Sequence, residues 1–180
     1  AKGIALTVDA EEQDRLDITL KAFGEVFVDS HMDNWHGLGI AVQAYGKRAI
    51  PVLRWLRRLS QQFGRRIPVR LVKGAYWDSE IKWAQERGLA DYPVFSRKMH
   101  TDVSYLAAMR YLLADAQAFY PQFATHNAHT VASARVAGGS SEYEFQRLHG
   151  MGEALYDAVR ADDRTARPVR IYAPIGGHED

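Results

Sequence analysis

Short apolar runs alternate with longer helical patterns along the 180 residues of the chain. Several of the runs are nearly continuous, which is typical of strands in a parallel sheet that is covered on both faces. The predicted strands are Ile4–Val8, Leu38–Val42, Val69–Val72, Gln122–Thr125, Glu144–Leu148 and Val169–Tyr172.

Helical patterns occupy the intervals between these runs. Three groups of apolar residues are spaced so that each group shares one helical face; they are Leu16, Leu20, Phe23 and Phe27, then Val52, Leu56, Leu59 and Phe63, then Leu106, Met109 and Leu113. Further helices are expected near Ser79–Arg87, Ala128–Ala137 and Glu153–Arg160. Glycines stand where helices should end, as left-handed residues do; they are Gly64, Gly88, Gly138 and Gly139.

Strand–helix alternation over six units indicates an α/β fold, either a doubly wound sheet or a (β/α)8 barrel. No GxGxxG motif follows the first strand, which weakens the case for a doubly wound sheet that binds a dinucleotide. A complete barrel has eight strands and takes roughly 250 residues. With six strands, residues 1–180 are expected to be a fragment of a single barrel domain, a partial (β/α)8 TIM barrel.

Composition narrows the class of protein further. Hydrophobic residues make up 47% of the chain and charged residues 25%, which is ordinary for a globular domain. The absence of cysteine excludes disulfides and thiolate metal sites and is compatible with a reducing cytosol. A net charge of +1 gives no strong attraction to nucleic acid. The N-terminus has no signal-peptide layout, and no window is apolar enough to span a membrane.

Polar side chains stand at the ends of the predicted strands. In a parallel barrel the site lies at the carboxyl ends of the strands. The residues at these ends are Asp9, Gln43, Arg70, Lys73, Thr125, His126, Asn127, His149 and Tyr172. This pattern favours a functional site at the carboxyl ends of the strands over a sheet with a purely structural role.

The segment Arg70–Trp77 carries the most information. Because side chains alternate along a strand, Arg70 is expected to face the barrel lumen, where a guanidinium needs an anion or another electron-rich acceptor. Gly74 and Ala75 would allow close backbone approach to a ligand, and Lys73 is suited to phosphate. The alternative is a surface Arg and Lys beside a packed Trp77.

Three other features are weaker signals. Ser96–Lys98 precedes a helix and is suited either to a phosphate or to a solvated basic loop. His126 and His129 form an HxxH pattern without a third ligand, which favours hydrogen bonding over metal binding. Five arginines are interpreted as solvated surface; they are Arg54, Arg57, Arg58, Arg65 and Arg66.

Six ordered motifs resemble the proline dehydrogenase domain of bacterial proline utilization A flavoproteins over nearly the whole chain. They are Asp9–Glu12, Val42–Tyr45, Arg70–Lys82 (RLVKGAYWDSEIK), Tyr120–Asn127 (YPQFATHN), Leu148–Glu153 (LHGMGE) and Arg170–Pro174 (RIYAP). The resemblance implies a distorted (β/α)8 barrel that holds FAD non-covalently and oxidises L-proline to 1-pyrroline-5-carboxylate by hydride transfer to flavin N5. The strands would then be the third to eighth of the barrel.

The resemblance also implies roles for individual residues. Asp9, Tyr76 and Tyr172 would surround the proline and act in catalysis together with Arg70, which would lie against the isoalloxazine. The FAD contacts would be Gln43, Arg70, Val72, Lys73, Gly74, Ala75, Trp77, Arg97, Lys98, Thr125, His126, Asn127, Gln146 and Leu148. No residue is assigned to a metal.

Two parts of the family's active site are expected to be missing. The family's catalytic lysine lies on a strand that would precede Ala1, and its pair of carboxylate-binding arginines lies on a helix that would follow Asp180. We therefore expect the chain alone to be nearly inactive. The resemblance further implies a cytoplasmic protein that passes electrons to a membrane quinone, associates with the inner membrane face and carries a fused aldehyde dehydrogenase domain.

Two other functions stay open at this point. The first is a barrel hydrolase with a metal held by Asp9, His126 and His149, or an aldolase that forms a Schiff base on Lys73. The second is a residual scaffold without enzymatic activity. A bound flavin would distinguish both from the oxidoreductase.

Overall fold

The computed structural model describes residues 4–29, 31, 35–162 and 167–176. The chain ends considered above, Ala1–Gly3 and His178–Asp180, lie outside these residues. In this part of the chain, no helix combines the length and the apolar composition that crossing a bilayer requires.

The fold is a six-stranded parallel sheet in which spatial order follows chain order, β1 to β6. The strands are β1 (Leu6–Val8), β2 (Leu38–Gln43), β3 (Ile67–Val72), β4 (Phe119–Ala124), β5 (Glu144–Leu148) and β6 (Val169–Tyr172). The helices are α1 (Leu16–Phe27), α2 (Ala49–Phe63), α3 (Trp77–Glu86), α4 (Lys98–Leu113), α5 (Ala128–Gly138) and α6 (Glu153–Ala161), with a 3-10 turn at Gln13–Arg15. The partial barrel that the alternation predicted is confirmed.

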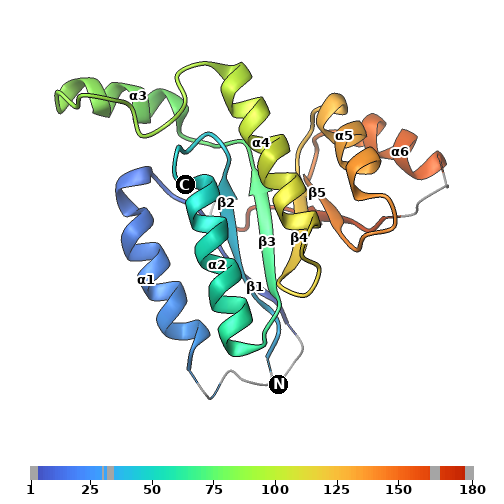
Figure 1. Cartoon of the computed structure of the whole chain (residues 1–180). Helices are drawn as coiled ribbons and strands as arrows, with labels where there is room; N and C mark the ends of the chain where they lie inside the picture. Colours follow the sequence, from blue (N-terminus) through green and yellow to red (C-terminus); the bar gives the residue numbers. More distant parts are fainter. Residues whose placement is uncertain (1–3, 30, 32–34, 163–166, 177–180) are drawn as a thin grey trace.

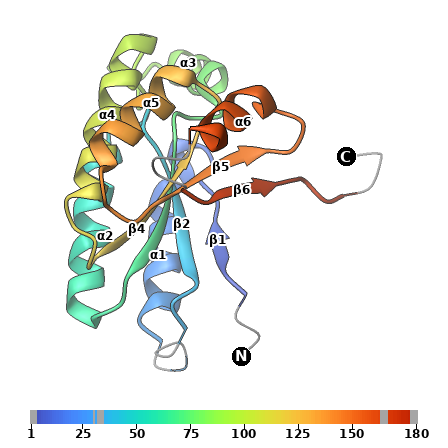
Figure 2. The same cartoon turned by 90° about the vertical axis from the view of Figure 1, so that its right-hand side faces the viewer.

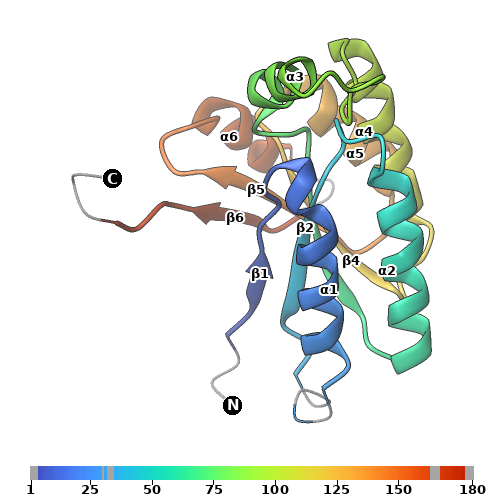
Figure 3. The same cartoon turned by 90° about the vertical axis from the view of Figure 1, so that its left-hand side faces the viewer.

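The sheet is strongly twisted and covered by helices on its outer side. Helices α1, α2 and α4 lie along the strands in Figure 1, and Figure 3 places them on one side with β6 reaching to the other. Strands β1 and β2 run upright, whereas β5 and β6 run nearly across the view (Figure 2). Helix α3 lies beyond the carboxyl ends of the strands (Figure 1). A parallel sheet in chain order with outer helices has the geometry of part of a barrel.

Alternate residues of each inner strand face the helices or the lumen. In β3, Val69 and Leu71 are fully buried in the core beneath the helices, whereas Arg70 and Val72 line the cleft described below. In β4, Phe123 packs in the core with its ring centroid 5.3 Å from that of Tyr143. The apolar residues of the strands therefore build the core, while the polar residues between them face inward.

Helix ends follow the glycine prediction with one exception. Gly64 ends α2 at φ 63°, in the left-handed region that favours glycine. The prediction was wrong for Gly138, which is the last residue of α5, while Gly139 is the residue with positive φ. A Cβ on Gly138 would come within 2.3 Å of the Tyr143 ring, so this glycine is needed for packing.

The basic stretch is only partly solvated, which corrects the interpretation of Arg65 and Arg66. Arg65 is 4% exposed, and its Nη2 donates to the Trp35 carbonyl oxygen at 3.0 Å while its Nη1 donates to that of Phe27. Arg66 is half-buried and donates through Nε to the Phe119 carbonyl oxygen at 2.7 Å. Both residues follow the end of α2. Their guanidinium groups donate to backbone carbonyl oxygens at the amino-terminal edge of the sheet. Arg54, Arg57 and Arg58 are exposed as predicted.

Candidate functional site

A cleft of about 590 Å³ opens at the carboxyl ends of the strands. Its wall includes residues from the ends of β1, β2, β3, β4 and β6. The predicted site residues on this wall are Asp9, Gln43, Arg70, Val72, Lys73, Gly74, Ala75, Tyr76, Lys98, Thr125, His126, Asn127 and Tyr172. The sequence-based selection of strand ends therefore identified one continuous surface; the roles of the individual residues remain predictions.

Arg70 connects the two edges of the sheet. Its Nε donates to Gln146 Oε1 at 2.8 Å, its Nη1 donates to Asp9 Oδ1, and its guanidinium carbon lies 5.3 Å from the centroid of the Tyr172 ring. A partly buried guanidinium requires such acceptors. The electron-rich partners that the sequence predicted for Arg70 are thus supplied by β1, β5 and β6.

The loop after β1 is fixed by contacts from the neighbouring strand ends. Gln43 donates through Nε2 to the Glu11 carbonyl oxygen at 2.8 Å and accepts from the Ala75 amide at 3.0 Å. The Tyr76 hydroxyl donates to Glu11 Oε2 at 3.2 Å. Burial and the nearby Glu11 carboxylate raise the pKa of Tyr76, which keeps its phenol in the donating form. These bonds hold Asp9 and Tyr76 at the same end of the cleft.

Gly74 is required by packing beneath the cleft. Its φ is 145°, and a Cβ at this position would meet the Tyr45 ring at 2.3 Å. Tyr45 itself is buried, with 2% exposure. The Tyr45 ring therefore requires a glycine here, and the close approach of a ligand to the Gly74 backbone stays a prediction.

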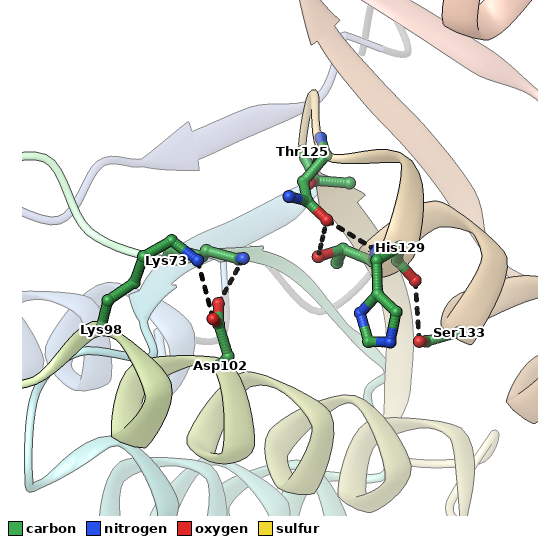
Figure 4. Close-up of polar contacts among 8 residues, drawn as sticks. Lys73, Lys98, Asp102, Thr125, His129 and Ser133 are labelled. Atoms are coloured by element: carbon green, nitrogen blue, oxygen red, sulfur yellow. Dashed lines mark hydrogen bonds and ion pairs between the residues drawn. The ribbon is translucent and has the colours of Figure 1, made fainter.

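Two lysines converge on one carboxylate. Lys73 follows β3 and Lys98 begins α4, and both ammonium groups donate to Asp102, Lys98 Nζ at 2.7 Å from Oδ2 (Figure 4). Hydrogen bonds from Lys73 and then Lys98 hold the pKa of Asp102 below its ordinary value. Two cations around one carboxylate leave a net positive charge at this rim of the cleft.

A second hollow of about 410 Å³ adjoins the cleft at this rim. Lys73, Gly74 and Lys98 line both spaces, and Trp77 lines only the second. The Trp77 indole donates to the Phe95 carbonyl oxygen at 2.9 Å and leaves its side chain partly exposed. Arg97 is exposed at the start of α4 and lines neither space.

The segment after β4 combines a helix cap with polar groups on the cleft wall. The Asn127 side chain accepts from the Thr130 amide at 3.0 Å and from the Thr130 hydroxyl at 3.1 Å, which caps α5. His126 Nε2 accepts from the Leu148 amide at 3.1 Å. Since an amide is only a donor, the proton of the neutral imidazole lies on Nδ1. Thr125 accepts from the Asn127 amide at 3.1 Å.

Gln146 and Leu148 support the cleft from behind, since neither lines it. Gln146 is 1% exposed and contacts Arg70, while the Leu148 amide contacts His126. His149 is exposed, and its backbone amide donates to the Tyr172 carbonyl oxygen at 2.8 Å. Within the described residues, no group of three or more His, Cys, Asp or Glu side chains is arranged to hold a metal, so the proposed Asp9, His126 and His149 set is not assembled.

A buried carboxylate, Glu144, lies behind the cleft at 1% exposure. It accepts from the side chains of Gln122, Gln146 and Arg170 at 2.7 to 2.9 Å and from the Tyr120 hydroxyl at 3.3 Å. Burial opposes its ionisation, but the bonds from Arg170 and Gln146 outweigh it and hold the pKa of Glu144 below its ordinary value. Burial and this carboxylate together raise the pKa of Tyr120 to about 12.

Sequence reasoning missed Glu11, Asp102 and Glu144. Asp102 stands four residues after Lys98, which is ion-pair spacing if the helix that carries Leu106 is extended back to Lys98. Glu144 stands two residues before Gln146 in a predicted strand, so both side chains had to share a face. These spacings could have identified both carboxylates. The Glu11 contacts depend on loop geometry that no local pattern encodes.

Comparison with known proteins identifies the family of the chain. A sequence model of the proline dehydrogenase family matches residues 1–180. The bifunctional protein PutA of Salmonella typhimurium is 51% identical over 98% of the chain, and that of Rhizobium meliloti is 52% identical over 98%. A crystal structure of the Bradyrhizobium japonicum proline utilization A mutant D779Y superposes with a TM-score of 0.94 at 51% identity over 98% of the chain. The chain spans only 14% and 15% of the two PutA relatives and 18% of the crystallised chain. With the family model covering its whole length, this chain belongs to the proline dehydrogenase family.

Proposed function

We propose that this chain forms one part of a single proline dehydrogenase barrel, and that the protein containing it uses FAD to oxidise L-proline to 1-pyrroline-5-carboxylate. The observation that carries the proposal is the convergence of Asp9, Arg70, Lys73, His126 and Tyr172 on one cleft. A membrane quinone as electron acceptor, a cytoplasmic location at the inner membrane face and a fused aldehyde dehydrogenase belong to the same proposal and are supported by family membership alone.

The cleft and the adjoining hollow have the shape and charge that an elongated dinucleotide requires. They measure about 590 and 410 Å³ and share Lys73, Gly74 and Lys98. Ligand sites of this kind are usually hollows of about 300–1,000 Å³ with a few fixed polar groups. The two ammonium groups would face the phosphates, and Trp77 offers an aromatic surface beyond them. The residues present therefore fit FAD.

Arg70 would provide positive charge where the flavin ring binds. FAD, when bound, supplies the acceptor for the hydride that leaves the proline carbon next to nitrogen. The Arg70 guanidinium is already oriented by Asp9 and Gln146, so it can stabilise developing negative charge without reorganising. Val72 and the Gln43-bound Ala75 amide would complete the flavin-facing wall.

Asp9, Tyr76 and Tyr172 would define the substrate end. The Tyr172 ring lies against Arg70, and the Tyr76 hydroxyl is held by Glu11. An aromatic face of this kind excludes water and sets the orientation of a small ring. Of the described residues that line the cleft, Arg70 is the sole arginine, and Asp9 already neutralises it. We therefore expect this chain alone to bind proline weakly and to turn it over very slowly.

The aldolase alternative is less well supported. A lysine that forms a Schiff base must react as the free amine. Lys73 Nζ instead donates to Asp102, so the amine is held by a carboxylate rather than free to attack a carbonyl.

FAD titration of the 180-residue chain tests the proposal. We expect bound oxidised flavin with an absorption band near 450 nm, roughly the value for this cofactor class. Arg70→Ala and Lys73→Ala should each weaken FAD binding about 10- to 100-fold, because each removes a charge-assisted contact. Arg58→Ala and Lys82→Ala are matched controls, since both residues are exposed on outer helices and do not line the cleft.

Two outcomes would contradict the proposal. One is a folded wild-type chain that binds no flavin at micromolar concentrations. The other is FAD binding that Arg70→Ala and Lys73→Ala leave unchanged. Trapping of Lys73 by borohydride in the presence of a carbonyl substrate would favour the aldolase instead.

A further inference from the structure

The amide of Gln146 lies between two groups of opposite hydrogen-bonding character. On one side Glu144 Oε1 accepts from Gln146 Nε2 at 2.7 Å, and on the other Arg70 Nε donates to Gln146 Oε1 at 2.8 Å. An ionised carboxylate only accepts and a guanidinium only donates. The amide therefore has a single favourable orientation, with its NH2 group toward Glu144 and its oxygen toward Arg70.

This arrangement links a buried charge to the functional cleft. Glu144 and Gln146 are both 1% exposed and lie on the lumen side of β5, and neither lines the cleft. Arg70 lines the cleft and contacts Asp9 and Tyr172 from the opposite edges of the sheet. The orientation of its guanidinium thus depends on the acceptor that Gln146 presents.

We propose that Glu144 is a positioning residue for Arg70: by fixing the Gln146 amide, it holds the guanidinium in the orientation that the cleft uses. The proposal rests on the proposed function for the importance of Arg70 to FAD, but the contact itself is independent of any ligand. Without the carboxylate, the amide can rotate by half a turn and present its NH2 group to Arg70, where two donors would face each other.

The other partners of Glu144 hold its carboxylate in place. Arg170 donates to both carboxylate oxygens at 2.8 and 2.9 Å, so the carboxylate is held in place from the β6 side. Gln122 Nε2 donates to Oε1 at 2.9 Å from the β4 side. A carboxylate fixed by Arg170 and Gln122 can impose its preference on Gln146, because moving it would break all of these bonds.

The test is an NMR measurement of the Arg70 Nε–H signal in the 15N-labelled chain without flavin. The signal is assigned by its loss in Arg70→Lys. In Glu144→Gln we expect this proton to shift and its exchange with water to accelerate about 10-fold, since its hydrogen bond to Gln146 is lost. Glu142→Gln is the matched control, because the same chemical change falls on a carboxylate that pairs with Arg66 at the surface. If Glu144→Gln does not fold, Glu144→Asp keeps the charge for Arg170 and withdraws the carboxylate from Gln146.

A mutant cycle distinguishes positioning from a general loss of packing. If Glu144 acts through Gln146, then Glu144→Gln should change the Arg70 signal in the wild-type background and have no further effect in Gln146→Leu. FAD affinity should fall about 5- to 10-fold in Glu144→Gln and follow the same pattern in the cycle.

An unchanged Arg70 Nε–H signal in folded Glu144→Gln would overturn the inference, as would an equal effect in both backgrounds. Failure of the wild-type chain to bind FAD would contradict the proposed function alone. In that case the flavin-free Arg70 signal would still decide whether Glu144 positions the guanidinium.

Discussion

All six residues of β2 are buried, whereas Leu6 in β1 is 55% exposed and Ile171 in β6 is 45% exposed. The inner strands β2 to β5 each have two strand neighbours, and among the described residues β1 and β6 each have one. Yet the cleft takes Asp9 and Tyr172 from these edges and Arg70 and Gln43 from the interior. The interior strands therefore fix the floor of the cleft, while the residues that its edges contribute, Asp9 and Tyr172, contact the long Arg70 side chain that reaches both.

The largest difference in unfolding free energy should come from truncating apolar side chains in an inner strand and in an edge strand. Phe123→Ala in β4 removes a fully buried ring from the aromatic core and should lower the free energy of unfolding by about 3–5 kcal/mol. Ile171→Ala in β6 removes a side chain that is partly in water and should cost under about 1 kcal/mol. Urea unfolding of both variants measures the difference. Equal losses would show that β6 is as well packed as the interior.

Arg65 tests how the β1–α1 unit is attached to the interior. Arg65→Ala leaves the carbonyl oxygens of Phe27 and Trp35 without their donor and removes a guanidinium 4.3 Å from the Phe27 ring centroid. We expect a loss of about 2–3 kcal/mol in unfolding free energy. Arg58→Ala, on the exposed face of α2, should stay within about 0.5 kcal/mol of wild type. A result for Arg65→Ala as small as that for Arg58→Ala would argue against this anchor.

Glu144 connects the edge strand β6 to the interior, and its contribution should depend on pH. Because folding lowers the pKa of Glu144, its stabilising effect is fully present above the unfolded value of about 4.3 and is lost as pH falls through the folded value. Wild type should exceed Glu144→Gln in stability by about 1 kcal/mol at neutral pH, since Arg170 is half exposed and its pairing is screened. The gap should close below about pH 4.

Unfolding curves of both proteins between acidic and neutral pH measure this gap. The Arg170 and Tyr120 partners do not titrate in that range, so the change is assigned to the carboxylate. A gap that widens as the pH falls would have the wrong sign for a carboxylate with a lowered pKa.

Most of the fold could be predicted from the sequence because hydrophobic periodicity is a local property. Among the described residues, all six strands and six helices were located; the strand bounds agree to within three residues, whereas the apolar pattern that marks α4 begins at Leu106 and the helix at Lys98. The predicted strands start late at β3 and β4. There Pro68, Tyr120 and Pro121 interrupt the apolar runs, although the ladder begins at Ile67 and Phe119. The cleft followed from the same pattern, since strand ends in a parallel barrel converge on one mouth.

The remaining errors involve contacts between residues far apart in the chain. Arg65 resembled its solvated neighbours, but its acceptors lie 30 and 38 residues earlier. The packing of the Tyr45 ring against Gly74 could not be predicted, because no local pattern reveals it. Asp102 completes a lysine contact over 29 residues. Such pairings depend on how loops bring elements together, and periodicity contains no information about that.

The match between strand order and chain order has a consequence for synthesis on the ribosome. Each new strand finds its hydrogen-bonding partner in the strand that has just left the exit tunnel, so the sheet can grow in one direction without waiting for distant sequence. The Arg70–Asp9 contact, 61 residues apart, can form early, whereas the Tyr172 ring reaches Arg70 only after β6 has emerged. Nascent chains would therefore carry a folded scaffold well before Tyr172 joins the cleft.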